Sequence, residues 1–394
     1  MLYYLLNQIK LQIKPDNINV KFTHKNNGIE LFTSKSLSKY LNRVKHQISQ
    51  YNNWDTIKKY TNPYEFIHTN IPHSNFSVSK YKPISRAFFK IVEIYNAFEL
   101  LNTNHPIKTY HLAEGPGGFI EATAYLRRNK YDEYYGMTLI EKKNQNIPGW
   151  KKSENFLRKH KNVTIEYGST KDGDLYHPDN FKFCYQKHSG EFDIITGDGG
   201  FDFSQDFNNQ EDQAFRLIFT QAMYAIAMQK KGGTFILKIY DCFLLSTNQL
   251  IYLLSCFYNN VYISKPNTSR HANSEKYIIC SDFKITDTTL ISYKLHKVLT
   301  VLDNIDFNTY SINKIINIPM DLYFKNHIEE INAIFGQQQI ENIINTTKIV
   351  SFREKKNDKL NQNKNINVQK CINWCIQNNI PYNKISQPSN IFLS

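Results

Sequence analysis

The chain has few cysteines, and their spacing excludes the common cysteine-based sites. The 394 residues include six: Cys184, Cys242, Cys256, Cys280, Cys371 and Cys375. No two of them form a C-x-x-C pair, so the spacing of a structural zinc site is absent and we expect no metal. Nothing in this pattern requires an oxidising compartment.

Long apolar runs are also missing. No stretch approaches the roughly 18–20 apolar residues that a helix needs to cross a bilayer, and the mean hydropathy is −0.51. The apolar run at residues 1–6 is too short for the apolar part of a signal peptide and lacks a basic start. We therefore expect a soluble protein with no membrane association. Its expected place is a reducing, cytoplasmic compartment.

Basic residues, by contrast, are in excess. The chain has 48 lysines and arginines against 35 aspartates and glutamates, a formal net charge of +13. A surplus of this size predicts attraction to a polyanion and says nothing about the fold. Nucleic acid is the first partner that we expect. A basic, soluble protein without such a partner is the alternative.

Hydrophobic periodicity divides the chain into three parts. A core at residues 81–286 lies between a basic, aromatic N-terminal segment (1–80) and a mainly helical C-terminal region (287–394). In the core, short apolar runs alternate with helical stretches, which favours an α/β fold with a doubly wound, mostly parallel sheet of seven strands. The expected strands are 109–113, 134–139, 163–167, 192–196, 234–239, 261–264 and 277–281.

Helices are expected inside the core and in both flanks. They fall at 38–51, 119–128, 211–229, 247–257 and 328–344. Residues 353–370 are charged, Asn-rich and poor in apolar side chains, so we expect a linker or mobile loop there. The short apolar patch at 371–376 is expected to dock as a helix.

A glycine-rich turn joins the first core strand to the first core helix. Its residues are Glu114, Gly115, Pro116, Gly117 and Gly118. Glycines let the backbone turn sharply and approach a ligand closely, and the helix N-terminus offers free amides. The complete dinucleotide pattern G-x-G-x-x-G is absent, so the turn suits S-adenosylmethionine better than NAD. A tight turn without a ligand is the alternative for this motif alone.

Four ionisable residues stand in distinctive local sequences. Lys90 ends SRAFFK, Asp198 ends FDIITGD, Lys238 ends GTFILK, and Glu275 follows the first residue of SEKYIIC. In an open α/β sheet, ligands bind outside the carboxyl ends of the strands. Residues that end strands are therefore expected to share a site, with surface salt bridges as the alternative.

Taken in order, these motifs resemble those of the FtsJ/RrmJ-like ribose 2′-O-methyltransferases. The resemblance covers about residues 80–286 and is closer to the mRNA cap branch, particularly to proteins of large cytoplasmic DNA viruses. It implies a Rossmann-like methyltransferase fold with S-adenosylmethionine as the cofactor. It also implies a catalytic Lys-Asp-Lys-Glu tetrad around the target 2′-hydroxyl, formed here by Lys90, Asp198, Lys238 and Glu275.

The tetrad also suits the chemistry of this reaction. A ribose hydroxyl is a poor nucleophile near neutral pH, so the site must help it lose a proton. A lysine does so only as a neutral base or as a cation that stabilises the developing alkoxide. Lowering a lysine pKa from about 10.4 to near 7 takes about 4–5 kcal/mol, and one unit charge about 4 Å away supplies or opposes about 4 kcal/mol. Lys238 is assigned one of these two roles, while Asp198 and Glu275 orient the lysines and Lys90 holds the hydroxyl.

Further contacts are expected around the tetrad. By the resemblance, residues 114–118 and Asp198 border the cofactor, and the turn at 170–174 holds the adenine. Asp172 or Asp174 would accept a hydrogen bond from the adenine amino group, with a plain Asp-Gly turn as the alternative. Lys265 and Arg270, close to Glu275, are the expected RNA contacts, with a solvated loop as the alternative.

The sequence therefore predicts an S-adenosylmethionine-dependent RNA ribose 2′-O-methyltransferase that acts on the capped 5′ end of mRNA. An rRNA or tRNA methyltransferase is the rival within the class, and the long flanking segments modestly favour the cap. A non-catalytic RNA-binding subunit of a capping complex is the rival from another class. The expected partners are RNA and other capping or transcription proteins.

Overall fold

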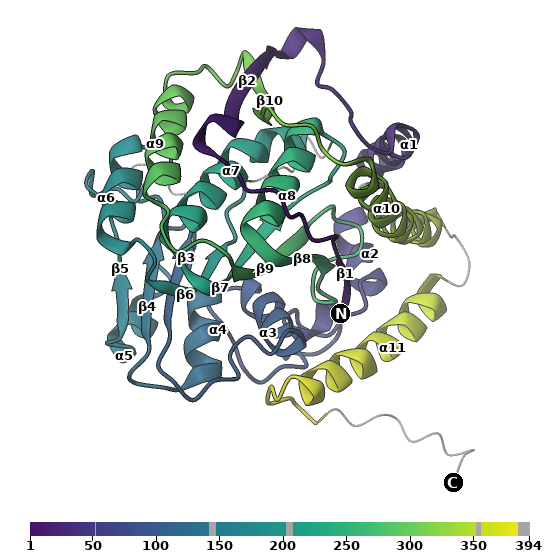
Figure 1. Ribbon diagram of the computed structural model, residues 1–394. Helices are drawn as coiled ribbons and strands as arrows, with labels where there is room; N and C mark the ends of the chain where they lie inside the picture. Colours follow the sequence, from purple (N-terminus) through teal and green to yellow (C-terminus); the bar gives the residue numbers. More distant parts are fainter. Residues whose placement is uncertain (52, 142–146, 202–207, 352–355, 385–394) are drawn as a thin grey trace.

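A central sheet of eight strands organises the molecule (Figure 1). The computed structural model describes residues 1–51, 53–141, 147–201, 208–351 and 356–384. The strand order is β1-β8-β9-β7-β6-β3-β4-β5. The order of connection reverses between β3 and β6: β4 and β5 follow β3 on one side, and β7 follows β6 on the other. That reversal is the place where doubly wound sheets bind ligands. The strands are β1 (Leu2–Leu5), β3 (Lys108–Leu112), β4 (Glu133–Met137), β5 (Val163–Ile165), β6 (Phe192–Gly197), β7 (Gln229–Ile239), β8 (Tyr258–Lys265) and β9 (Lys276–Phe283).

The strand directions confirm the doubly wound, mostly parallel arrangement. β3, β4, β5, β6 and β7 are parallel to their neighbours within this group. β9 runs antiparallel between β7 and β8, and β1 adds antiparallel to β8 with Leu2 opposite Lys265. The expected count of seven strands was wrong because β1, at the N-terminus, adds an eighth strand at the edge of the sheet beside β8.

Helices cover both faces of the sheet, as Figure 1 shows. α3 and α4 cover one face, where Phe88, Ile91 and Phe119 are fully buried. α6, α7, α8 and α9 cover the other, and α8 is buried along its whole length. In the part of the chain that the structure describes, no helix combines the length and apolar character needed to cross a bilayer. The core helices are α3 (Ala87–Ala97), α4 (Gly118–Arg127), α5 (Glu154–Lys159), α6 (Pro178–His188), α7 (Gln210–Met228), α8 (Leu245–Phe257) and α9 (Thr289–Asp303).

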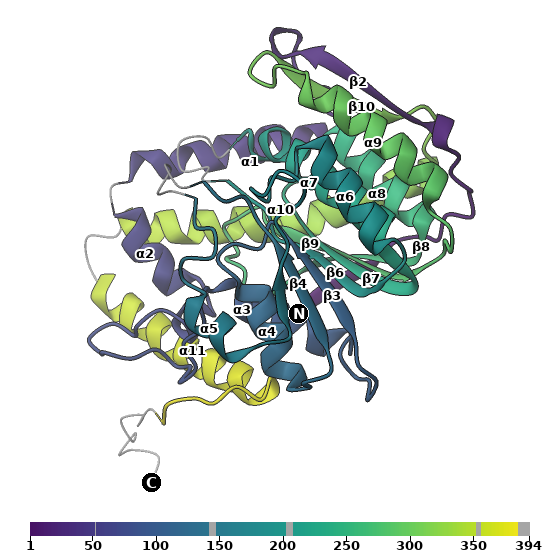
Figure 2. The ribbon, with the colours of Figure 1, turned by 90° about the vertical axis from the view of Figure 1, so that its left-hand side faces the viewer.

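The N- and C-terminal segments pack against each other beside the core. β2 (Ile18–His24) pairs antiparallel with β10 (Tyr310–Ile316). α1 (Lys35–His46) and α2 (Trp54–Thr61) contact the long helix α10 (Leu322–Ser351). Figures 1 and 2 both show α1, α2, α10 and α11 together on one side of the molecule. The two flanks therefore form a joint layer, which adds a wall to the site described below.

Helix α11 (Lys356–Gln377) corrects the expectation of a linker. Residues 356–370 are helical, whereas 353–355 lie outside the described residues. The polar stretch gains its order from tertiary contacts: the Asn367 side chain donates to the main-chain oxygen of Tyr60 at 2.8 Å. Cys371 and Trp374 are buried in the core beneath α3, so the expected docking of the 371–376 patch as a helix is confirmed.

Candidate active site

A cavity of about 1130 Å³ opens at the carboxyl ends of the parallel strands. Gly115 follows β3, Thr138 follows β4, Asp198 follows β6, and Lys238 lies near the end of β7. Parallel strands end at the same edge of a sheet, so these four residues meet although they are far apart in the sequence. The opposite wall comes from α1, α2 and the loop that precedes β9.

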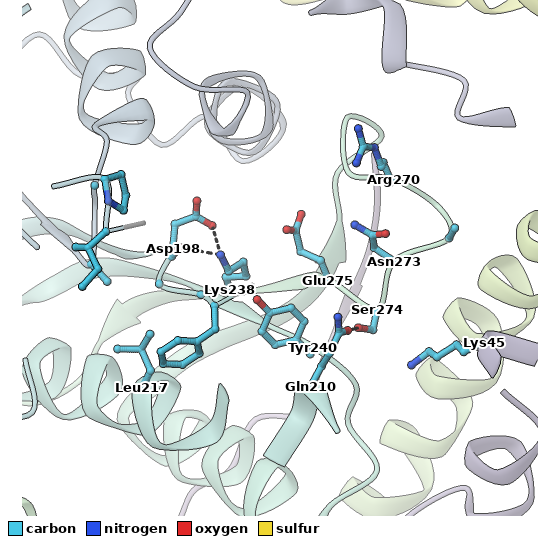
Figure 3. Close-up of a pocket in the computed structure, with 18 of the residues that line it drawn as sticks. Lys45, Asp198, Gln210, Leu217, Lys238, Tyr240, Arg270, Asn273, Ser274 and Glu275 are labelled. Atoms are coloured by element: carbon cyan, nitrogen blue, oxygen red, sulfur yellow. Dashed lines mark hydrogen bonds and ion pairs between the residues drawn. The ribbon is translucent and has the colours of Figure 1, made fainter. Parts of the chain in front are cut away.

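The structure brings the four residues of the predicted tetrad together as two ion pairs. Nζ of Lys238 lies 2.7 Å from the main-chain oxygen of Asp198 and 3.3 Å from its Oδ1 (Figure 3). Nζ of Lys90, on α3, lies 2.7 Å from one carboxylate oxygen of Glu275 and 2.8 Å from the other. Asp198, Lys238 and Glu275 line the cavity. Lys90 is buried next to Glu275.

The charges of the tetrad shift one another's pKa. Burial lowers the pKa of Lys90 below its ordinary value, although Glu275 and Asp198 oppose the shift. Burial acts on Glu275 in the raising direction, but Lys90 and Lys238 outweigh it and hold its pKa well below the usual range. For Lys238, burial is outweighed by Asp198, Tyr240 and Glu275, which raise its pKa. Lys238 is therefore an ammonium ion at neutral pH.

Two residues that support the tetrad were missed from the sequence. The hydroxyl of Tyr277 donates to Oδ1 of Asp198 at 2.9 Å, and the hydroxyl of Ser269 donates to Oε1 of Glu275 at 2.7 Å. Tyr277 lies directly opposite Lys238 in the antiparallel β7–β9 pair, so both side chains leave the same face of the sheet. That pairing, invisible in either strand alone, is the signal that identifies Tyr277.

The residues of the glycine-rich turn have different structural roles. Gly115 lines the cavity. Glu114 accepts hydrogen bonds from the amides of Phe119 and Ile120 at 2.7 and 2.9 Å and so caps α4; burial raises its pKa to about 8.

The rest of the turn sets how closely α3 and α4 approach. The main-chain oxygen of Pro116 accepts from the Ser153 hydroxyl. Gly117 has φ +111°, a conformation that favours glycine. A Cβ on Gly118 would collide with Oγ of Ser85, just before α3. Of the five turn residues predicted to border the cofactor, Gly115 lines the cavity, as does Asp198, the sixth residue of that prediction.

The two candidate aspartates for adenine occupy different places. Oδ1 of Asp172 accepts from the Asp174 amide at 3.0 Å and from the Asn180 side chain at 3.2 Å, so Asp172 holds its own turn. Asp174 lines the cavity beside Leu139 and Leu175. Apolar walls, a carboxylate and the Gly115 backbone suit a nucleoside with a polar tail, so the donor set fits S-adenosylmethionine. Among the described residues, no group of His, Cys, Asp or Glu side chains is arranged to hold a metal ion.

The two predicted RNA contacts differ as well. Lys265 is only 5% exposed, and its Nζ donates to the main-chain oxygens of Asn273 at 2.5 Å and Glu275 at 2.8 Å. It fastens the loop before β9 from the inside, so the prediction of a direct RNA contact was wrong for this residue. Arg270 lines the cavity while it pairs with Glu65 at 2.6 Å, and its contact with RNA stays a prediction.

Family comparison agrees with this fold. Residues 83–283, just over half of the chain, match the FtsJ-like methyltransferase family. The chain belongs to the FtsJ-like methyltransferases, and S-adenosylmethionine is the methyl donor. The resemblance inferred from the motifs is thus confirmed at the level of the family.

Individual relatives are animal proteins named as cap-specific methyltransferases, one of them as inactive. The chain is 28% identical to "Cap-specific mRNA (nucleoside-2'-O-)-methyltransferase 1A" of Caenorhabditis briggsae, over 57% of this chain and 26% of the relative. It is 29% identical to "Cap-specific mRNA (nucleoside-2'-O-)-methyltransferase 2" of Danio rerio, over 64% of this chain and 35% of the relative. A third relative, 26% identical over 57% of this chain and 27% of its own length, is an "Inactive cap-specific mRNA (nucleoside-2'-O-)-methyltransferase 1B" of C. briggsae.

The chain spans about a quarter to a third of the length of these curated relatives. The relatives named here are not viral, so the expected closeness to viral proteins gains no support from them. Among solved structures, a putative ribosomal RNA methyltransferase from Plasmodium falciparum is 21% identical, with a TM-score of 0.35 over 50% of this chain and 97% of that chain.

Proposed function

We propose that this chain is an S-adenosylmethionine-dependent RNA ribose 2′-O-methyltransferase that acts on the capped 5′ end of mRNA. The observation that carries the proposal is the pair of buried ion pairs, Lys238–Asp198 and Lys90–Glu275, at the cavity edge of the sheet. Membership of the methyltransferase family supports methyl transfer, and the names of the animal relatives support a cap acceptor. The net charge of +13 supports an RNA substrate.

Each member of the tetrad has a proposed task. Bound S-adenosylmethionine supplies an activated methyl group. Asp198, fixed by Tyr277, holds the Lys238 ammonium at the cavity. Lys238 then stabilises the negative charge that grows on the ribose oxygen, whose proton passes to solvent water in the open cavity, and S-adenosylhomocysteine is the leaving group. Lys90, fixed by Glu275, orients the hydroxyl.

Lys238 is also within reach of the alternative role, that of a general base. A second positive charge, such as the sulfonium of S-adenosylmethionine, would disfavour its ammonium form. At a separation of about 6 Å and an effective dielectric near 20, the repulsion would be about 3 kcal/mol. This corresponds to about 2 pKa units. The pKa of Lys238 is raised by its carboxylate neighbours, so we propose the cationic role as the main one.

Two rival functions lead to different acceptors. An rRNA or tRNA methyltransferase would prefer structured RNA without a cap. A non-catalytic subunit would bind RNA and transfer no methyl group. One relative is named as inactive, so similarity to cap enzymes alone does not establish turnover. Here the complete tetrad favours an active enzyme. Association with other capping or transcription proteins is part of the same proposal.

Methyl transfer from labelled S-adenosylmethionine tests the proposal. The acceptors are a short capped RNA, the same RNA without a cap, and a folded tRNA-sized RNA. We expect label in the capped RNA at a rate at least about tenfold above the other two, about 1.4 kcal/mol of discrimination. Preference for folded RNA would support the rRNA or tRNA reading. Binding of cofactor and RNA without transfer to any acceptor would support the non-catalytic subunit.

A further inference from the structure

Two buried lysines contact a single carboxylate beside the cavity, and a third buried lysine lies next to them. Nζ of Lys45, on α1, lies 2.8 Å from Oδ2 of Asp241, and Nζ of Lys276, on β9, lies 3.5 Å from Oδ1. Lys265 has main-chain oxygens as its partners. All four side chains are buried. We refer to Lys45, Lys265, Lys276 and Asp241 together as the lysine cluster.

The lysine cluster carries more positive than negative charge. Lys45 and Lys276 overcome the effect of burial and hold the pKa of Asp241 below its usual range, so this carboxylate is ionised. Burial and Asp241 raise the pKa of neighbouring Glu211 to about 8, so Glu211 does not compensate the surplus at neutral pH. Burial and then Lys276 lower the pKa of Lys265 to about 7, which reflects the same crowding of cations. A desolvated surplus of this kind favours binding of an anion.

Lys45 is the member of the cluster through which an anion would be reached. Lys45 is 5% exposed, like Lys265, but it lines the cavity, which Lys265 and Lys276 do not. Figure 3 shows Lys45 across the cavity from Asp198, with its ammonium pointing toward Ser274. Asn273 also lines the cavity, and its side-chain amide is a further hydrogen-bond donor. The wall is therefore polar, cationic and separate from the Gly115 end of the cavity.

We propose that Lys45, held in place by Asp241 and backed by Lys276 and Lys265, binds a phosphate group of the acceptor RNA. The inference rests on the proposed function. A lysine recognises phosphate as a compact point charge, and an RNA that presents a ribose hydroxyl to the tetrad carries phosphates a few ångströms away on both sides. The phosphate is a backbone phosphodiester or part of the polyphosphate bridge of a 5′ cap, and both offer the same charged oxygens. Lys265 thus contributes charge from behind instead of a direct contact.

A purely structural ion pair is the competing explanation, because Lys45–Asp241 also ties α1 to the end of β7. The two explanations predict different effects of substitution on RNA affinity. If the pair is only structural, Lys45→Met and Asp241→Asn both lower the melting temperature and neither changes RNA affinity. If Lys45 binds phosphate, Lys45→Met weakens RNA binding, whereas Asp241→Asn frees Lys45 and strengthens it.

Fluorescence anisotropy with short single-stranded RNA, in S-adenosylhomocysteine and at several salt concentrations, tests the proposal. One RNA carries a cap and the other a 5′-hydroxyl. Lys39→Met is the matched control, because Lys39 lies on the same helix and is exposed. For Lys45→Met we expect weaker binding and a log–log salt slope less steep by about 0.7, the value for one phosphate contact on a single strand. Asp241→Asn should steepen the slope, and Lys39→Met should change neither quantity.

The two RNAs identify the source of the phosphate. A loss of affinity with both RNAs assigns Lys45 to the backbone, and a loss confined to the capped RNA assigns it to the polyphosphate bridge. Wild-type affinity and slope in Lys45→Met, or an equal loss in Lys39→Met, would overturn the proposal. If Lys45→Met does not fold, Asp241→Asn decides: a steeper slope supports the proposal, and an unchanged or shallower slope overturns it. Wild-type turnover on the same RNA is measured in parallel, so a failure of the proposed function is recognised separately.

Discussion

Replacement of Lys238 by alanine is expected to remove turnover while leaving cofactor binding nearly intact. The ammonium of Lys238 lies 2.7 Å from the main-chain oxygen of Asp198 and 3.3 Å from its carboxylate, at the end of β7. The residues that fit the cofactor best, Gly115 and Asp174, lie on other loops of the cavity. The substitution therefore removes the charge assigned to the ribose hydroxyl and leaves the cofactor subsite in place.

The size of the effect follows from the role of the ammonium. Groups that stabilise developing charge contribute about 100- to 1000-fold to kcat, and general acid–base groups contribute about as much or more. We expect Lys238→Ala to lower kcat at least about 100-fold, or about 2.7 kcal/mol of activation free energy. Loss of one partner from a buried ion pair costs about 3–5 kcal/mol of folding stability. The lower end is expected, because Tyr277 still donates to Asp198.

The assay combines single-turnover methyl transfer to capped RNA with calorimetry of S-adenosylhomocysteine binding. Lys238→Arg is the informative companion variant, because arginine keeps the charge and does not deprotonate in proteins. The raised pKa of Lys238 predicts a cationic role, so Lys238→Arg should be faster than Lys238→Ala. Equal rates in the two variants would instead indicate a neutral base.

If folded Lys238→Ala kept more than about a tenth of the wild-type rate, Lys238 would not supply the contribution expected of a group that acts on the hydroxyl. A large loss of cofactor affinity in the same variant would show that Lys238 belongs to the cofactor subsite. Thermal unfolding with and without S-adenosylhomocysteine establishes that the variant is folded.

Three further predictions concern the parts around the tetrad. Asp174→Ala should raise the Kd for S-adenosylhomocysteine about tenfold or more, because a hydrogen bond to a charged group contributes about 1.5–3 kcal/mol; Asp172→Ala should lower the melting temperature and leave calorimetric affinity almost unchanged. Gly118→Val should cost about 1–3 kcal/mol of unfolding free energy through overpacking against Ser85, and a second change, Ser85→Ala, should restore part of it; full stability of the single variant would refute the close contact. The pKa of Lys265 is lowered to about 7 in the folded protein, whereas a lysine in the unfolded chain has a pKa of about 10.4. Between these pH values the unfolded chain binds more protons, so stability relative to Lys265→Met should rise with pH, by up to about 1.4 kcal/mol per pH unit. A constant difference in urea unfolding from pH 7 to 10 would contradict this burial.

The positions of Asp198 and Lys238 were predictable because local patterns determine them. Each ends an apolar run that forms a strand, and the carboxyl ends of parallel strands meet at one edge. The same argument predicted the doubly wound sheet and the place of Gly115. Glu275 and Lys90 come from a loop and a helix instead, and their assignment to the tetrad rested on the resemblance of their motifs.

Other features depend on contacts between distant parts of the chain, which no local pattern reveals. β1 becomes a strand because the edge of β8 is available to it. Residues 356–370 read as a linker by composition, yet Asn367 and the apolar residues after it anchor them as a helix. Lys265 looked like an exposed cation, but the loop before β9 folds over it and supplies carbonyl partners.

The position of the transferred methyl group is the most direct test of the central claim. Capped RNA is incubated with the protein and S-adenosylmethionine, digested to nucleosides and cap dinucleotides, and analysed by mass spectrometry. The geometry of Lys90, Asp198, Lys238 and Glu275 around one cavity predicts a single methyl group on a ribose 2′-oxygen, absent from the Lys238→Ala reaction. A methyl group on a base, or ribose methylation that persists in folded Lys238→Ala, would contradict the account.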